Sequence, residues 1–296
     1  MKTINPKDLA TPELHALLQG AVTPRPIAFV SSINGAGEVN LSPFSFFNLF
    51  SANPPILVFS PSRRVRDNTT KHTLDNVLEV PEVVIHVVGH DLVEQMSLAS
   101  TEYPKGVNEF VKAGLTAMPS NQVAPPRVKE APVAFECKVL QVFPLGDQGG
   151  AGNLVICEVI QIHLDEAILD ASGAIAPLKL DPVARLGGNW YTKVTADSLF
   201  QIPKPLMILG IGVDQIPEDI RNSPVLSGNN LGRLANVECL PSPEELALFS
   251  AREDLEDIRR RFRLDSESWT DHLHRWAKEE LEAGNVDLAW KILLQK

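Results

Sequence analysis

The fold class of this chain is decided by residues 133–164, VAFECKVLQVFPLGDQGGAGNLVICEVIQIHL. Apolar and charged side chains alternate along residues 135–139, which is typical of a half-buried antiparallel strand. A long glycine-rich hairpin loop follows over residues 146–152. Residues 154–164 are apolar on both faces, so we expect one face to meet the core and the other a second subunit or a covering helix.

Further strand-like runs occupy residues 27–32, 38–41, 56–60 and 83–88, which gives six strands in all. Asn34-Gly35 between the first two is a hairpin signal. Helices are expected over residues 68–77 and 91–100. The sequence therefore predicts a mainly β fold, a β-barrel with added helices.

The pattern changes from strands to helices near residue 210, which predicts a first domain over 1–210 and a loop-rich linker with a helical extension over 211–296. Ser242 and Pro243 are typical of the cap and first position of a helix, and Glu245 completes a capping box. The basic run 259–261 follows acidic residues on one predicted helix, which indicates a solvated face. Apolar residues at helical spacing are Ala251, Leu255, Ile258 and Phe262, then Trp269, Leu273, Trp276 and Leu281, then residues 288–294.

Composition excludes several classes of function. The 27 basic and 37 acidic residues give a net charge of −10, which disfavours nucleic acid as a partner. No apolar run approaches the roughly 20 residues that cross a bilayer, and the N-terminal residues do not resemble a signal peptide, so we expect a cytoplasmic protein. Three widely spaced cysteines suggest neither a disulfide framework nor a metal site.

The first candidate for chemistry is NLSPFSFFN at residues 40–48, followed by SANPP at 51–55. Small polar and aromatic side chains mix here without strand or helix periodicity. A planar ring with a polar edge, such as isoalloxazine, needs both flat apolar contact and hydrogen-bond donors. An aromatic-rich turn with no ligand is the alternative.

The second candidate is SPSRRVRDNTT at residues 60–70, which follows a strand and opens a predicted helix. Three arginines at a helix N-terminus suit a phosphate dianion, with Asp67 capping the helix or holding an arginine. A capped helix with exposed arginines is the alternative. One strand, about 15 to 20 Å, separates the two candidates, which one extended mononucleotide can span.

The third candidate is RLGGNWY at residues 185–191, where paired glycines permit close approach to a ligand and two aromatic rings offer flat surfaces. Alone it is also a common turn. His86 and His163 lie in strand-like runs without metal-ligand spacing, so we interpret them as core or interface histidines.

Together these segments resemble the flavin reductase-like FMN-binding split-barrel family, in the branch of flavoredoxin and nitrilotriacetate monooxygenase component B. The resemblance covers roughly residues 20–205. Many relatives carry Lys-Asp-Thr where this chain has Arg66-Asp67-Asn68-Thr69. The motifs that carry the resemblance are residues 23–31 (TPRPIAFVS), 40–48 with Pro54-Pro55, 66–69, 125–128 (PPRV) with Glu136-Cys137, and 185–188 with Tyr191.

The resemblance implies a six-stranded antiparallel Greek-key split barrel, a homodimer, and FMN reduced by NADH or NADPH. The implied function is an NAD(P)H-dependent flavin reductase that serves a monooxygenase or another electron acceptor. A non-enzymatic FMN-binding electron carrier or sensor, like flavoredoxin, is the alternative. The implied cofactor contacts are Ser45, Phe46, Phe47, Asn48, Ser51 and Ala52 at the ring, Ser60, Arg63, Arg66, Asp67, Asn68 and Thr69 at the phosphate, and Gly188 and Tyr191. No catalytic residue is predicted, because a hydride can pass directly from nicotinamide to flavin.

Overall fold

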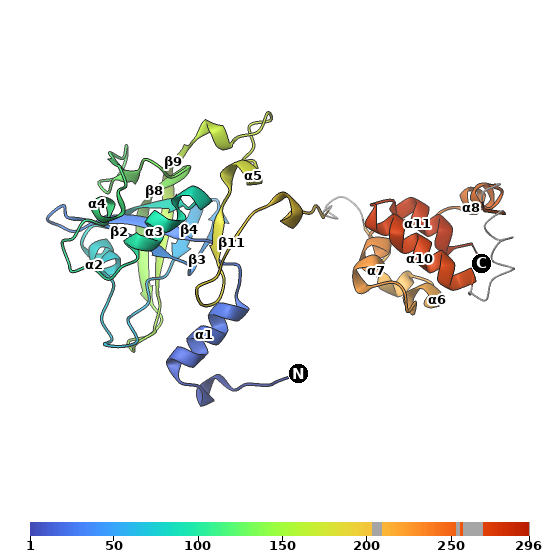
Figure 1. Cartoon of the computed structure of the whole chain (residues 1–296), viewed down its shortest axis with the longest axis horizontal. Coiled ribbons are helices and arrows are strands. Elements are labelled where there is room, and N and C mark those ends of the chain that lie inside the picture. Colours follow the sequence, from blue (N-terminus) through green and yellow to red (C-terminus); the bar gives the residue numbers. More distant parts are fainter. Residues whose placement is uncertain (203–208, 253–254, 257–268, 296) are drawn as a thin grey trace. The chain divides into compact units, whose positions relative to one another are not determined.

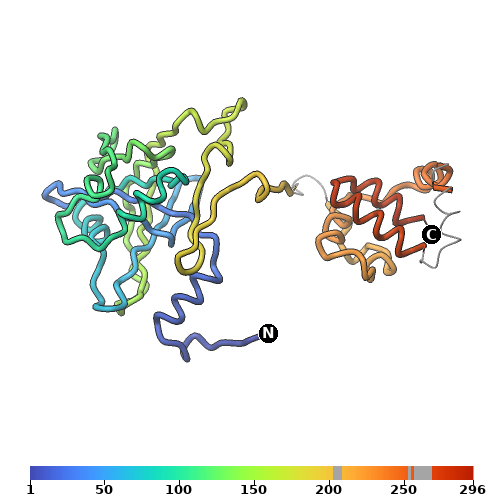
Figure 2. The backbone as a smooth tube through the Cα atoms, in the orientation of Figure 1, coloured from blue at the N-terminus to red at the C-terminus, as the bar shows by residue number. Residues whose placement is uncertain are grey.

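The computed structural model describes residues 1–202, 209–252, 255–256 and 269–295. The chain divides into two compact units, Met1–Phe200 and Gln201–Lys296 (Figures 1 and 2). Within the described residues, every β-strand belongs to the first unit, and the second unit is helical.

The first unit is built around a seven-stranded antiparallel sheet in the order β2-β1-β5-β8-β9-β4-β3. Its longest strands, β8 and β9, pair as the hairpin expected from residues 133–164. Six strands coincide with predicted ones, and the mainly β class with added helices is confirmed. The strands are β1 (Ala28–Ile33), β2 (Val39–Phe44), β3 (Phe47–Ala52), β4 (Pro55–Phe59), β5 (Glu82–Val87), β8 (Val133–Pro144) and β9 (Asn153–Leu164), with two small sheets of β6 (Ala117–Met118) and β7 (Arg127–Val128), and of β10 (Val183–Arg185) and β11 (Tyr191–Lys193).

The main sheet has one strand more than the six predicted, because residues 47–52 form β3 despite their lack of strand periodicity. β3 is an edge strand that pairs only with β4, and its side chains at 48–50 are exposed, so no buried face imposes alternation. A register shift between Leu49 and Ser51 further breaks the period of two.

The helix predicted over residues 68–77 begins at His72 instead. Asn68 adopts a left-handed backbone with φ of 56°. Its N–H donates to the Arg64 carbonyl, and Asp67 accepts a hydrogen bond from the Thr69 N–H. These local bonds hold residues 64–69 in a turn, which is why the helix starts later. The helices of this unit are α1 (Thr11–Ala21), α2 (His72–Glu79), α3 (Val93–Ala99), α4 (Glu109–Ala113) and α5 (Pro177–Leu180).

Both faces of β1 are buried. Phe29 belongs to a cluster with side chains of α3 and α4, whereas Val30 belongs to a second cluster with β4, β5 and β9. Each such large apolar side chain contributes on the order of 1.5–3 kcal/mol by its burial. The sheet thereby forms a rigid support for the loops at its ends.

The second unit packs around Trp290, which is 1% exposed and donates its indole N–H to the Leu234 carbonyl at 3.0 Å. The predicted capping box is confirmed: Ser242 Oγ accepts from Glu245 N at 3.2 Å, and Glu245 accepts from Ser242 N at 2.8 Å. Ile258, Phe262 and the basic run 259–261 lie outside the described residues. The helices are α6 (Glu218–Arg221) and α7 (Gly228–Ala235), both in the stretch expected to be rich in loops, then α8 (Pro243–Ser250), α10 (Trp269–Glu282) and α11 (Val286–Leu293).

Candidate flavin site

The first two candidate segments meet directly. Ser45 and Phe46 form the turn between β2 and β3, and Ser60 follows the end of β4. The Ser60 N–H donates to the Phe46 carbonyl at 2.8 Å, continuing the β3–β4 pairing. The predicted ring segment and the predicted phosphate loop therefore start from one point of the sheet edge.

The remaining residues of the ring segment lie along β3. Phe47 is half-buried and packs against the core cluster of β4 and β9. Asn48 and Ala52 are exposed, and Ser51 is half-buried. This leaves the edge strand with backbone groups and small side chains available to a ligand.

The loop after Ser60 is tied together by its own side chains. Arg63 donates from Nε to Asn68 Oδ1 and from Nη2 to the Asn68 carbonyl, both at 2.6 Å. Asn68 in turn donates to the Asp147 carbonyl at 2.9 Å. Thr69 donates its hydroxyl to Asp67 at 2.7 Å, and this bond is the main reason that the pKa of Asp67 falls to about 2. Asp67 thus stabilises the loop.

Glu102 lies beside this loop, although the sequence did not indicate that it would. Its carboxylate pairs with Arg66 at 2.7 Å, Arg64 at 3.1 Å and Lys71 at 3.4 Å. Hydrogen bonds from Arg66 and then Arg64 lower the pKa of Glu102 to about 2. Three cations gathered on one carboxylate leave a net positive charge, which suits a phosphate. Glu102 is more than 30 positions downstream, so no local pattern connects it to the loop.

Lys71 marks a second difference from the expected site. The first helical N–H groups of α2 belong to residues 72–74, because Lys71 is the N-cap. The helix N-terminus and Lys71 therefore join Arg63 and Arg66 as candidates for the phosphate.

Ser60 carries the clearest sign of a missing partner. Its side chain is 9% exposed, and its buried hydroxyl has no hydrogen-bond partner. Gly152 lies against it: a Cβ built on Gly152 would be 2.6 Å from Ser60 Oγ. A buried hydroxyl left unpaired costs free energy unless a ligand or water satisfies it. The absence of a side chain at Gly152 therefore makes room for this hydroxyl.

The third candidate segment reaches the first through Arg25. The backbones of Arg25 and Arg185 exchange two hydrogen bonds of 2.9 Å. Arg185 lies over the Tyr191 ring, 4.6 Å from its centroid, and donates to its hydroxyl at 2.7 Å and to the Gly188 carbonyl at 2.9 Å. Ser45, Arg185 and Tyr191 line one pocket of about 220 Å³. The ring segment and the segment at residues 185–191 therefore each contribute side chains to the same cavity.

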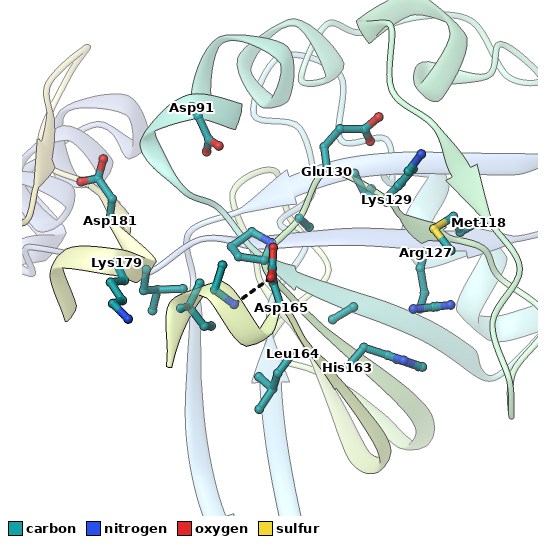
Figure 3. A pocket seen from close by; sticks show the side chains of 17 residues that line it. Asp91, Met118, Arg127, Lys129, Glu130, His163, Leu164, Asp165, Lys179 and Asp181 are labelled. Atoms are coloured by element: carbon teal, nitrogen blue, oxygen red, sulfur yellow. Dashed lines mark hydrogen bonds between the residues drawn. The ribbon is translucent and has the colours of Figure 1, made fainter. Parts of the chain in front are cut away.

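A larger depression of about 550 Å³ lies at the other end of β8 and β9 and contains none of the predicted flavin residues (Figure 3). Several of its charged lining residues are hydrogen-bonded to the backbone: Glu130 accepts from the Thr116 N–H at 3.1 Å, Asp165 accepts from the Ala167 N–H at 2.9 Å, and Lys179 donates to the Leu169 carbonyl. Its lining residue His163 contacts a buried carboxylate. Buried Glu136 accepts from His163 at 2.6 Å and from the N–H groups of Asn121 and Gln122. Burial raises the pKa of Glu136, but these hydrogen bonds lower it overall. We interpret this end as structural and place the candidate site at the Ser60 end.

His86 is a core histidine, as predicted. It is fully buried, with Nδ1 2.7 Å from the Phe29 carbonyl and Nε2 accepting from the Val128 N–H at 2.9 Å. Both ring nitrogens are therefore used to join β5 to β1 and β7. Among the described residues, no group of three or more His, Cys, Asp or Glu side chains could hold a metal ion.

Comparison with known proteins agrees with this geometry. The sequence model of the family described as "Flavin reductase like domain" matches residues 20–179, more than half of the chain. This chain belongs to the flavin reductase-like family. An uncharacterized protein of Aquifex aeolicus is 40% identical to the flavin reductase-like chain over 189 residues, which cover 64% of this chain and 94% of the relative. The resemblance drawn from the sequence is thereby confirmed.

Solved structures show the same fold for the flavin reductase-like unit. Nitrilotriacetate monooxygenase component B from Bacillus cereus aligns with a TM-score of 0.64 and 32% identity, over 68% of this chain and 98% of that one. A flavin reductase with split barrel domain from Shewanella frigidimarina aligns with a TM-score of 0.59 and 24% identity, over 69% and 99%. The flavin reductase-like unit is therefore a split barrel. No described helix is long and apolar enough to span a membrane.

Proposed function

We propose that the first unit binds FMN and acts as an NAD(P)H-dependent flavin reductase. The observation that carries this proposal is the buried, unpartnered Ser60 hydroxyl, which lies where the predicted ring segment and phosphate loop meet. Membership of the flavin reductase-like family supports the flavin as the group that fits there.

The residues at hand fit FMN at both ends. Ser45 and Phe46 with β3 would hold the ring, and the Ser60 hydroxyl would donate to the flavin. Arg63, Arg66 and Lys71, with the N-terminus of α2, would hold the phosphate. A bound flavin supplies hydride acceptance from a reduced nicotinamide and electron release to an acceptor. The protein's part is to orient the rings and exclude water, so no acid or base is required.

We further propose a homodimer. Several apolar side chains on β8, β9 and the loop between them are exposed, which is unusual for a monomer's sheet. A second copy packed against this hairpin would bury some of them, and sedimentation velocity at micromolar concentration should give twice the chain mass. The residues are Leu140 (55% exposed), Phe143 (50%), Leu145 (59%), Ile162 (52%) and Leu164 (43%).

The function is tested in two steps. Titration of the flavin-free protein with FMN should quench flavin fluorescence at a stoichiometry of one per chain. Anaerobic stopped-flow mixing of the complex with NADH or NADPH should then bleach the flavin absorbance. Binding without bleaching by either nucleotide would favour the electron carrier or sensor, and the absence of binding would exclude both functions.

A further inference from the structure

Arg25 joins three segments that are distant in sequence. It is 5% exposed. One terminal nitrogen donates to the carbonyls of Gln19 and Val22, the latter at 2.6 Å, and the other donates to the Leu186 carbonyl at 2.9 Å. Its Nε lies 3.5 Å from Ser45 Oγ. One guanidinium thus contacts the end of α1, the glycine loop at 185–188 and the turn between β2 and β3.

These hydrogen bonds place a positive charge at the C-terminal end of α1. The last carbonyls of a helix lack intrahelical partners and carry partial negative charge, so a cation placed there is stabilising. The four hydrogen bonds described for the Arg25 guanidinium all end on neutral oxygens. Carbonyl dipoles therefore compensate this buried cation. Burial, followed by the charge of Arg185, lowers the pKa of Arg25.

The helix that Arg25 holds, α1, contacts three parts of the candidate site along its length. At its start, Thr11 Cγ2 lies 2.9 Å from the Cβ position of Gly150, in the hairpin loop beside the phosphate segment. In its middle, the His15 ring meets the Phe46 ring edge-on, with centroids 6.0 Å apart. At its end, Gly20 Cα lies 3.1 Å from the Cβ position of Gly187.

The length of α1 agrees with this course. Eleven residues of helix span about 16 Å, so one helix can contact the hairpin loop at its start and the glycine loop at its end. No residue of α1 is fully buried, so packing alone does not fix the helix on the barrel. Among the contacts described above, the hydrogen bonds of Arg25 to Gln19 and Val22 are the most directional.

We propose that Arg25 is a positioning residue that anchors α1 as one wall of the flavin site and aligns the glycine loop and Ser45 at the ring end. The role of α1 as a wall of the flavin site rests on the proposed flavin function. The anchoring of α1 by Arg25 does not depend on that function. In this proposal, α1 and Arg25 affect binding of the flavin ring, whereas the residues of the phosphate loop affect binding of the phosphate.

The test compares Arg25→Gln with Arg127→Gln, a matched control. Arg127 also donates to a backbone carbonyl, that of Pro119, but at the other end of the sheet. Two quantities are measured on the full chain. Hydrogen exchange of the α1 amides reports anchoring without any ligand, and titrations with FMN and with riboflavin separate ring contacts from phosphate contacts.

Arg25→Gln should increase the hydrogen-exchange rate of the α1 amides at least tenfold. It should also lower the affinities for FMN and for riboflavin by the same factor, about tenfold, as expected for the loss of one or two charge-assisted hydrogen bonds. Arg127→Gln should change neither. Unchanged α1 exchange in folded Arg25→Gln overturns the anchoring, and a loss confined to FMN overturns the ring-end assignment. If the wild-type chain binds neither flavin, the proposed function fails and with it the flavin wall, while exchange still decides the anchoring.

A second pair of variants covers the case in which Arg25→Gln does not fold. Gly187→Ala would press the glycine loop against Gly20, whereas Gly20→Ala meets no atom within 4 Å. Gly187→Ala should weaken riboflavin and FMN equally and loosen the end of α1, and Gly20→Ala should do neither. Equal behaviour of the two variants would contradict the proposal.

Discussion

At the scale of single residues, two kinds of buried polar group have opposite meanings. Both nitrogens of His86 are hydrogen-bonded to the backbone, so this residue is structural. The Ser60 hydroxyl is equally shielded from water and has no partner. Because an unpaired buried donor is costly, the second case indicates a ligand or a bound water, whereas the first indicates packing.

His86 should make the stability of the first unit depend on pH. Burial, more than any other cause, lowers its pKa to about 4 in the folded chain. The unfolded chain takes up that proton near pH 6.5, so stability is full above about pH 6.5 and falls by up to about 3 kcal/mol as the pH drops towards 4. Urea unfolding of residues 1–200, followed by circular dichroism, should show this loss.

The control for this prediction is His86→Gln, whose side chain does not titrate. Its stability at neutral pH should be lower, but its stability should fall less between pH 6.5 and 4 than that of the wild type. Equal pH dependence of the two proteins would show that His86 is not the group responsible.

Arg66 tests the phosphate loop. Its side chain is 70% exposed and paired with Asp67 and Glu102, so it is accessible to a phosphate. Arg66→Ala should weaken FMN by about tenfold, through loss of a charge-assisted contact, and leave riboflavin unchanged. Titrations with the two flavins measure this difference. Unchanged FMN affinity would restrict Arg66 to its ion pair with Glu102.

At the scale of elements, the site is made where strands end and loops begin. The hairpin loop between β8 and β9 presses glycines against the phosphate segment: the Cβ position of Gly149 lies 3.0 Å from the backbone of residues 64 and 65. A side chain cannot enter there without moving the backbone. The glycine-rich composition of this loop is therefore required by close packing, and the hairpin signal alone does not reveal it.

Gly152 gives a prediction for this loop. Gly152→Ala should displace Ser60 Oγ and weaken FMN by roughly fivefold, the loss expected for one hydrogen bond. In a Ser60→Ala background the clashing atom is absent, so the second substitution should have little further effect. Fluorescence titration of the four proteins measures this cycle. Additive losses would mean that Gly152 acts on binding without Ser60.

At the scale of the whole molecule, the two units have separate hydrophobic cores. Every predicted cofactor contact lies before residue 200, within the first unit. The family match also ends at residue 179. The first unit therefore contains all the flavin contacts proposed for this chain.

A chain that ends at Phe200 should bind FMN within about threefold of the full-length affinity, because no proposed contact is removed. Fluorescence titration measures this, with circular dichroism to confirm that the shortened chain is folded. A folded but flavin-free product would place part of the site in residues 201–296.

The sequence by itself determined the mainly β class, six of the seven strands of the main sheet, the capped helix after Ser242 and the family. These follow from periodicity, capping and ordered motifs, all of which act over a few residues. Only the tertiary structure decided that residues 47–52 form an edge strand, that α2 begins at His72, and that Arg25, Glu102 and α1 belong beside the site. The reason is physical: edge strands escape the burial that imposes alternation, and a salt bridge or a buried arginine joins residues whose separation along the chain leaves no local pattern.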